Sequence, residues 1–377
     1  MEITCFLSKY RKRISFNYSK QKLLFDVNPD LFSSFAIDKG TYHLIDSLRK
    51  NNSIKYEKIL DLGCGYGIIG IFLKKINPKS EIHCIDRDAL AIEFTKHNAK
   101  LNNCPIKVYS SLDYQSIKDE FNLICCNYPA KAGINAFKKF IYNASTHLKS
   151  DGILAIVIVK ELLKDFENIL TDEIRVIKKF QSSGHYVFHL KFNKKIEFKK
   201  DPYTRNKVKY EIQNKKYELI TAYNVPEFES PSFTTKAIIK LLCEIPKNLT
   251  ICIANPNQGH LAIAAVHYLN PNQIILNSRD LLSLEYSKKN LIKNQFTKIK
   301  INHSTSMKSK ADVLIWNLGN NIEPIQFEKQ CQEIKKIYKY IIIGAQKSKI
   351  NQLRRAIKPY KQAQEKNALA VLIKTIS

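Results

Sequence analysis

The chain has 377 residues, of which 44% are hydrophobic and 25% charged, so we expect a folded protein long enough for two domains. No apolar stretch is long enough to cross a bilayer, and residues 1–13 lack the apolar segment of a signal peptide, so we expect a cytoplasmic protein without membrane contact. Its nine cysteines show no Cys-x-x-Cys pair and no zinc-like spacing, so no metal site is expected.

The net charge of +27 arises from 61 Lys and Arg against 34 Asp and Glu. A field of this size attracts polyanions, which favours RNA or DNA as a partner. It argues against a small-molecule substrate and, more weakly, against a protein substrate. The excess of Lys over Arg has a second explanation, because an AT-rich genome over-uses Lys, Asn and Ile codons.

In chain order, the first strong motif is a glycine-rich turn. Residues 59–70 read Ile-Leu-Asp-Leu-Gly-Cys-Gly-Tyr-Gly-Ile-Ile-Gly, which predicts a strand, a tight turn and a helix. Gly63, Gly65 and Gly67 leave no Cβ in the way of a ligand that approaches the backbone. Asp61 precedes them, and its carboxylate would repel a pyrophosphate but is compatible with a zwitterionic methionine tail. The turn therefore favours S-adenosyl-L-methionine over a dinucleotide.

A second acidic residue ends the next apolar run. Residues 82–88 read Ile-His-Cys-Ile-Asp-Arg-Asp, so a strand is expected to end at Asp86. At the edge of a parallel sheet this carboxylate can accept hydrogen bonds from both hydroxyls of a ribose. Farther along, Ser111 and Leu112 lie where the adenine ring is expected, with Asp113 as an alternative that the sequence leaves open.

The next apolar run, residues 121–126, ends in the turn Asn127-Tyr128-Pro129. Carboxyl ends of parallel strands meet at one edge of a sheet, so this turn is expected beside the glycine turn. The side-chain oxygen of Asn127 and the backbone carbonyl of Tyr128 can accept hydrogen bonds from a planar amine and aim its lone pair at a methyl group. Pro129 fixes the turn and removes a competing donor. These three catalytic candidates predict methyl transfer to nitrogen by in-line displacement.

The second half of the chain repeats the first. The matched segments are 28–33 and 224–229, 82–88 and 274–280, 93–98 and 285–290, and 122–127 and 312–317. Each half alternates strand and helix patterns, which predicts an α/β fold with a mostly parallel sheet covered on both faces. We therefore expect two tandem domains, at 1–195 and 196–377, joined by the basic segment 193–209, which we interpret as a solvated linker.

The two copies differ where the first has its cofactor residues. In the second copy Asp61 is replaced by Ile253 or its neighbour, Gly63 by Asn255, Gly65 by Asn257, and Asp86 by Ser278. Only Gly259 keeps a glycine of the turn. We expect the second copy to keep the fold without the cofactor, and to serve in packing, in holding substrate, or in both.

The first copy resembles the methyltransferase small domain family, which includes bacterial ribosomal RNA guanine-N2 methyltransferases built as tandem duplications. The resemblance rests on the turn 61–67, Asp86, the Asn127-Tyr128-Pro129 turn with the following 131–133, and Lys160 and 184–186 near its end. It implies class I, Rossmann-like domains with seven-stranded sheets and S-adenosyl-L-methionine as cofactor. It also implies that the segment 32–41 closes over the cofactor. The cofactor-binding residues that this reading adds are Phe32, Asp38, Gly40, Thr41, Arg87 and Asn127.

The sequence departs from the family pattern at two points. Tyr128 replaces a proline, and Ala130 stands where the family has an apolar or aromatic residue that would stack on a flipped base. Phe32, Tyr128 and Tyr186 are the candidates to replace that aromatic. In the bacterial tandem enzymes the degenerate copy comes first, whereas here the intact copy does.

The favoured function is S-adenosyl-L-methionine-dependent methylation of guanine-N2 in ribosomal RNA, on an unpaired or flipped nucleotide. Adenine-N6 and a protein glutamine amide are alternatives, because each presents a planar nitrogen. A non-catalytic RNA-binding or assembly factor is the alternative from another class, and the intact cofactor residues of the first copy argue against it. The oligomeric state stays open, and a monomer is plausible because the two copies can pair internally.

Overall fold

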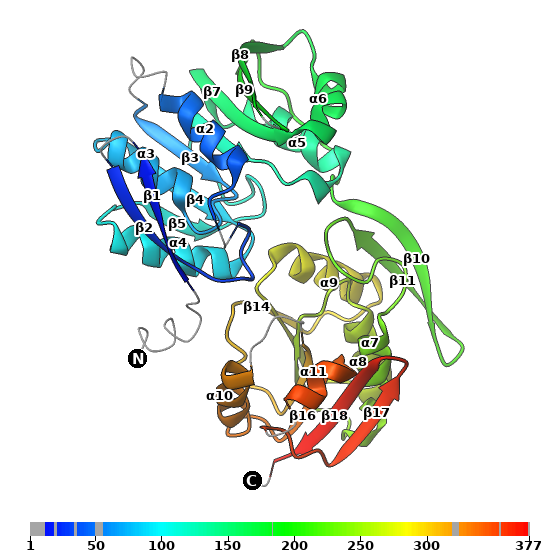
Figure 1. Ribbon diagram of the computed structural model, residues 1–377. Coiled ribbons are helices and arrows are strands. Elements are labelled where there is room, and N and C mark those ends of the chain that lie inside the picture. Colours follow the sequence, from blue (N-terminus) through cyan, green and yellow to red (C-terminus); the bar gives the residue numbers. More distant parts are fainter. Residues whose placement is uncertain are drawn as a thin grey trace. The chain divides into compact units, whose positions relative to one another are not determined.

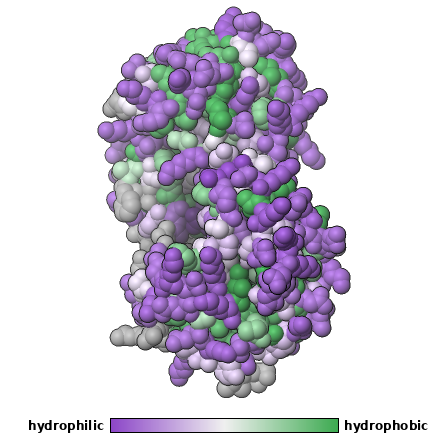
Figure 2. Space-filling view, turned by 90° about the vertical axis from the view of Figure 1, so that its right-hand side faces the viewer, coloured by the Kyte–Doolittle hydropathy of each residue, from purple (hydrophilic) through white to green (hydrophobic). Residues whose placement is uncertain are grey.

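The computed structural model describes residues 12–18, 21–33, 36–49, 56–182, 184–318, 324–353 and 356–375. The chain divides into two compact units, Met1–Tyr203 and Thr204–Ser377 (Figure 1). Among the described residues, no helix is long and apolar enough to cross a membrane. Hydrophilic side chains cover most of the face drawn in Figure 2, between smaller apolar patches.

The first unit is built on a seven-stranded sheet. Its strands, in spatial order, are β5 (Lys107–Ser110), β4 (Glu81–Asp86), β3 (Lys58–Leu62), β6 (Phe121–Asn127), β7 (Leu148–Val159), β9 (His185–Phe192) and β8 (Ile174–Ser182). The first five run parallel, and β9 is antiparallel to both of its neighbours. The mostly parallel arrangement brings the ends of β3, β4 and β6 to the same edge.

Helices cover both faces of this sheet. They are α2 (Lys39–Arg49), α3 (Ile68–Ile76), α4 (Ala89–Leu101), α5 (Ile134–Ala144) and α6 (Leu163–Ile169), with short 3-10 helices η1 (Ala130–Ala132) and η2 (Lys160–Leu162). Successive strand residues point to opposite faces, so Ile59 packs in the core under α2, α3 and α4, and Leu60 in the core under α5 and α6. A hairpin of β1 (Lys12–Tyr18) and β2 (Gln21–Val27) packs on the α3 and α4 side.

The second unit has the same sheet order. Its strands are β14 (Ile299–His303), β13 (Gln273–Ser278), β12 (Thr250–Ala254), β15 (Val313–Asn317), β16 (Tyr340–Gln346), β18 (Ala368–Lys374) and β17 (Lys361–Glu365), with a separate hairpin of β10 (Thr204–Ile212) and β11 (Lys215–Ala222). Its helices are α7 (Phe233–Ile239), η3 (Leu242–Glu244), α8 (His260–Leu269), α9 (Leu281–Lys293), α10 (Pro324–Ile334) and α11 (Lys347–Gln352). The predicted fold class, two tandem α/β domains with seven-stranded sheets, is confirmed.

The duplication extends to buried hydrogen bonds. The side chain of Asn98, in α4, bonds to the backbone N–H and carbonyl of Asp26 and to the carbonyl of Tyr66. Asn290, in α9, makes the same three bonds to Ile220 and Gln258. We call each set an asparagine clamp, because it ties the hairpin to the helix that follows the second strand after it, α4 after β4 and α9 after β13. The clamps align Asp26 with Ile220.

This alignment corrects the register of one repeat and the interpretation of the basic segment. Counting from the clamps, residue 28 corresponds to 222, so the pairing of 28–33 with 224–229 is two residues out of register. The segment 193–209 is not a free linker. The backbone N–H of Ile196 donates to Ser145 Oγ at 2.7 Å and that of Phe198 to Asn143 Oδ1 at 3.0 Å, and β10 begins at Thr204.

Candidate cofactor and substrate site

The glycine turn between β3 and α3 leaves open space over its backbone. Gly63, Gly65 and Gly67 have φ angles of 77°, 58° and 91°, a left-handed region that side chains disfavour. A Cβ on Gly63 or Gly65 would meet no atom within 4 Å, whereas one on Gly67 would lie 2.9 Å from Thr95 Cγ2. The first two glycines therefore form a cradle, and the third allows close packing against α4.

Asp86, at the end of β4, holds this turn in place. Its Oδ2 accepts from the backbone N–H of Gly65 at 3.0 Å, and its Oδ1 accepts from that of Asp88 at 2.9 Å. Burial raises the pKa of Asp86, against the effect of these two donors. The residue predicted to bind a ribose thus also positions the glycine turn, and Arg87 follows it half-buried.

The segment after β5 lies beside Asp86. The backbone N–H of Ser111 donates to the carbonyl of Asp86 at 3.0 Å, and both Ser111 and Leu112 are buried. The carboxylate of Asp113 accepts a hydrogen bond from the Tyr203 hydroxyl and lies 3.7 Å from Lys139 Nζ. Protein groups also engage the Ser111 hydroxyl, which donates to the carbonyl of Asp113 at 2.7 Å, so Ser111, Leu112 and Asp113 all stay candidates for contact with an adenine ring.

Asp61, in β3, is fully buried under the start of α3. Its Oδ2 accepts from the backbone N–H of Gly70 at 2.9 Å, and its Oδ1 has no hydrogen-bond partner among the described residues. Burial raises the pKa of Asp61 to about 7. Asp61 Oδ1 can therefore accept a hydrogen bond from a donor outside the protein.

We expect Asp61→Asn to change how stability depends on pH. In the folded protein the Asp61 carboxyl keeps its proton up to about pH 7, whereas in the unfolded chain it loses the proton near pH 3.8. The free energy of unfolding of the wild type therefore decreases as the pH rises from 3.8 to about 7. The variant does not titrate there. The free energy of unfolding of Asp61→Asn minus that of the wild type should therefore increase by roughly 3 kcal/mol from about pH 5 to about pH 8. Urea unfolding without ligand measures this difference, and parallel curves for the two proteins would contradict the raised pKa.

Asn127, at the end of β6, is oriented by Asp38, directly before α2, and by Thr41 in the first turn of α2. Its Nδ2 donates to Asp38 Oδ2 at 2.8 Å and to Thr41 Oγ1 at 2.9 Å, and the backbone N–H of Thr41 donates to the same Asp38 oxygen at 3.0 Å. Both amide hydrogens are thereby used, and no described residue donates to Asn127 Oδ1. A Cβ on Gly40 would lie 2.9 Å from Asp38 Oδ2, so this glycine leaves room for the carboxylate.

The three aromatic candidates for stacking on a base differ in their exposure. Tyr128 and Tyr186 are each 7% exposed. The Tyr128 ring packs at 4.5 Å and 5.1 Å, between centroids, from Phe137 and Phe140, and the Tyr186 ring stacks on Phe188. Both rings belong to the core beneath the sheet and are not exposed for stacking on a base. Phe32 is 70% exposed, so its ring remains the candidate for stacking on a base.

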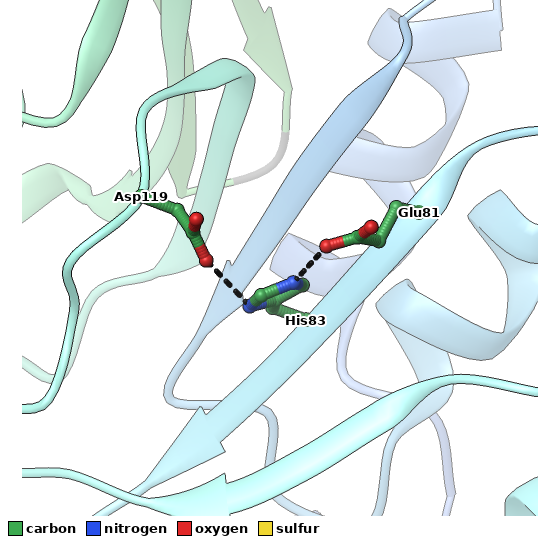
Figure 3. A group of neighbouring side chains, drawn as sticks. All are labelled: Glu81, His83 and Asp119. Carbon is green, nitrogen blue, oxygen red and sulfur yellow. Dashed lines mark hydrogen bonds and ion pairs between the residues drawn. The ribbon is translucent and has the colours of Figure 1, made fainter.

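Glu81, His83 and Asp119 gather at the opposite ends of the strands (Figure 3). His83 Nε2 lies 2.6 Å from Glu81 Oε1, and Lys58 Nζ lies 3.2 Å from Glu81 and 3.0 Å from Asp119. Lys107 adds a contact of 2.9 Å to Glu81, and the lysines with His83 lower the pKa of Glu81 to about 2. The ammonium groups of Lys58 and Lys107 thus supply the positive charge beside these carboxylates. We interpret Glu81, His83 and Asp119 as part of an ion-pair network away from the cradle.

Comparison with known proteins identifies a family that matches the first unit. The profile of the methyltransferase small domain family matches residues 22–189. The ribosomal RNA small subunit methyltransferase C of Photobacterium profundum is 34% identical over 155 residues, covering 40% of this chain and 44% of that protein. The uncharacterized protein YbxB of Bacillus subtilis (strain 168) is 31% identical over 185 residues, covering 47% of this chain and 90% of YbxB.

The match to the first of these relatives is partial, since the chain spans less than half of its length. A solved structure resembles the whole chain. It is the 16S rRNA N2 G1207 methyltransferase (RsmC) of T. thermophilus in complex with AdoMet and guanosine, with a TM-score of 0.71, 12% identity, and coverage of 98% of this chain and 99% of that one. The likeness shows a shared fold over both units.

Proposed function

Because the chain belongs to the methyltransferase small domain family, we propose that its first unit transfers a methyl group from S-adenosyl-L-methionine to an exocyclic amine of an RNA base. The favoured target is guanine-N2 in ribosomal RNA. The observation that carries the proposal is the fixed amide of Asn127, whose donors are bound by Asp38 and Thr41 at the sheet edge that also holds the cradle. The names of the relatives and of the solved structure support the choice of guanine-N2.

The residues at the cradle fit the cofactor. Gly63 and Gly65 leave the space into which it would enter, and Asp86 lies at the strand end where a ribose diol would meet a carboxylate. The unpartnered oxygen of Asp61 would receive a donor from the ammonium group or from a bridging water. When bound, the cofactor supplies an electrophilic methyl group.

The chain's own residues prepare the nitrogen that accepts the methyl group. Asn127 Oδ1 and the carbonyl of Tyr128 accept the two N–H groups of the amine and direct its lone pair. The negative charge of Asp38, at the far end of the amide, strengthens the acceptor character of Oδ1. These acceptors also offset the positive charge that develops on the nitrogen. The methylated amine loses its proton to solvent afterwards, so no strong base is required.

We propose that the second unit carries no cofactor. Asn255 and Asn257 keep left-handed φ angles of 56° and 53°, so the turn retains its backbone while gaining side chains. The Nδ2 of Asn255 donates to the carbonyl of Asn317, at the end of β15, at 2.9 Å. This side chain occupies the position that glycine leaves open in the first unit.

The test uses RNA from cells that lack the gene. Ribosomal subunits and free RNA from these cells are incubated with the purified protein and isotope-labelled S-adenosyl-L-methionine, and the nucleosides are separated by mass spectrometry. We expect label in N2-methylguanosine. Label in N6-methyladenosine would move the target to adenine. Label in protein alone would favour the glutamine amide, and an absence of cofactor binding would favour a non-catalytic RNA-binding factor.

Replacing Phe32 tests the stacking role that this ring would have. Stacking of a base on an aromatic ring is worth about 1–3 kcal/mol, so Phe32→Ala should lower kcat/KM for RNA by about 10-fold or more. Phe32→Tyr should retain most of the activity, because it keeps the ring. Steady-state methylation assays with both variants measure the effect, and equal losses in both would argue against stacking.

A further inference from the structure

The second unit keeps the polar arrangement that orients Asn127, although its cradle is filled. Asn317 ends β15 as Asn127 ends β6, and its Nδ2 donates to Thr235 Oγ1 at 3.3 Å. The backbone N–H of Thr235 donates to Ser232 Oγ at 3.1 Å, as that of Thr41 does to Asp38. The amide and the hydroxyl thus persist at equivalent places.

The carboxylate of this arrangement comes from a different residue. Ser232 stands in the position of Asp38 and carries no charge, and Glu227, from the loop after β11, replaces it. The Oε1 of Glu227 accepts from the Thr235 hydroxyl at 2.5 Å and from the backbone N–H of Ser232 at 3.0 Å. We call Asn317, Thr235 and Glu227 the second relay. It is present in a unit whose cradle is filled, which indicates a use separate from the cofactor.

Buried polar atoms beside the second relay lack partners. Among the described residues, Glu227 Oε2 and both ring nitrogens of His260 have no hydrogen bond. His260 is fully buried at the start of α8, with its ring 5.1 Å from that of Tyr210. Burial lowers the pKa of His260, against the opposing effect of the Glu227 carboxylate. A buried polar atom is costly to leave unpaired, so a ligand or ordered water is needed here.

Exposed aromatic rings and cations adjoin the second relay. Tyr223, Phe228 and Phe233 are 36%, 39% and 37% exposed. The Arg205 guanidinium lies 4.1 Å from the Phe228 centroid and 5.7 Å from that of Tyr223. Lys366 and Lys236 lie 4.5 Å and 5.6 Å from that of Phe233. We call these three rings with their cations the aromatic rim.

The aromatic rim connects to the second relay through the chain itself. Phe228 directly follows Glu227, and Phe233 directly follows Ser232, whose backbone N–H donates to Glu227. Partly exposed aromatic rings interleaved with cations are typical of proteins that bind single-stranded nucleic acid, in which rings stack on bases and cations meet phosphates. The net charge of +27 favours a polyanion as the partner, so the aromatic rim fits RNA.

We propose that the second unit binds an unpaired nucleotide of the RNA substrate without methylating it. Asn317 Oδ1 accepts a hydrogen bond from the base, the aromatic rim stacks on it, and Lys236 and Lys366 contact phosphates, since Arg205 is paired with Glu229 at 2.9 Å. The proposal rests on the proposed function, because it assigns the second unit to the same RNA.

The test measures RNA binding and methyl transfer separately in the full-length protein. Phe228→Ala and Asn317→Ala should each weaken binding of a labelled 20-nucleotide single-stranded RNA by roughly 10-fold, in fluorescence anisotropy, and leave cofactor affinity unchanged. In methylation assays the same variants should raise KM and leave kcat intact. Tyr360→Ala is the matched control, since Tyr360 is an exposed ring under Lys374 in the same unit, outside the aromatic rim.

Unchanged RNA affinity in both variants would overturn the proposal, and so would an equal loss in Tyr360→Ala, which would indicate diffuse charge attraction. Loss of binding to a ribosomal protein with intact RNA binding would assign the aromatic rim to a protein partner instead. Circular dichroism checks that the variants fold. The anisotropy result is readable even if the wild type transfers no methyl group, so failure of the proposed function is distinguishable from failure of this inference.

Discussion

Asn127→Ala is expected to slow methyl transfer by about 10²–10³-fold, as does the loss of one preorganised polar group in other enzymes. The variant loses the oxygen that accepts the amine N–H, and Asp38 and Thr41 lose the amide that they hold. The glycine turn and Asp86 make no hydrogen bond to Asn127, so the affinity for the cofactor should change little. Single-turnover kinetics at saturating cofactor, with calorimetry for binding, measure the two quantities.

The chain supplies a matched control for this substitution. Asn317→Ala removes the equivalent amide at the end of β15, and it should leave kcat unchanged because the second unit has no cradle. If Asn127→Ala methylates as fast as the wild type, the catalytic assignment is wrong. Equal losses of kcat in the two variants would mean that both units take part in the chemical step.

Asp86→Ala should weaken cofactor binding by about 100-fold. A hydrogen bond to a charged group contributes roughly 1.5–3 kcal/mol, and a carboxylate on a ribose diol makes two. The substitution also removes the acceptor of the Gly65 N–H, so the glycine turn loses part of its support. Isothermal titration with S-adenosyl-L-methionine measures the effect. Ser278→Ala, at the equivalent strand end of the second unit, should leave the affinity unchanged, and equal effects at both positions would mean that the second unit also binds cofactor.

The fold was largely predictable, because each half alternates apolar runs with turns in the same order. The basic segment was misinterpreted for a physical reason. In β10, charged Lys207 and Lys209 alternate with the inward-facing Val208 and Tyr210, which is the pattern of a half-exposed strand. Its high charge resembles a linker, and the core that it covers is distant in sequence.

The site was predictable where it depends on local chemistry and unpredictable where it depends on packing. The glycine turn, Asp86 and Asn127 were identified from their own neighbours in sequence. The bonds from Asp38 and Thr41 to Asn127 join residues more than eighty positions apart, and no local pattern reveals them. The burial of the Tyr128 ring depends on α5. The second relay was missed because its carboxylate comes from Glu227, whereas Ser232 stands in the position of Asp38. A position-by-position comparison of the two copies therefore finds no acid there.

The asparagine clamps bear on how the chain avoids misassembly. Two similar hairpins and two identical clamps in one polypeptide invite exchange, in which the hairpin of one copy docks on the helix of the other. The residues that the clamps align differ in a way that opposes this. Asp26 is buried with Arg13 at 2.6 Å and His97 at 2.8 Å, whereas Ile220 stands at its place in the second unit. An exchanged hairpin would carry Arg13 with it but would lose the contact of Asp26 with His97, so the divergence of the copies disfavours the exchange.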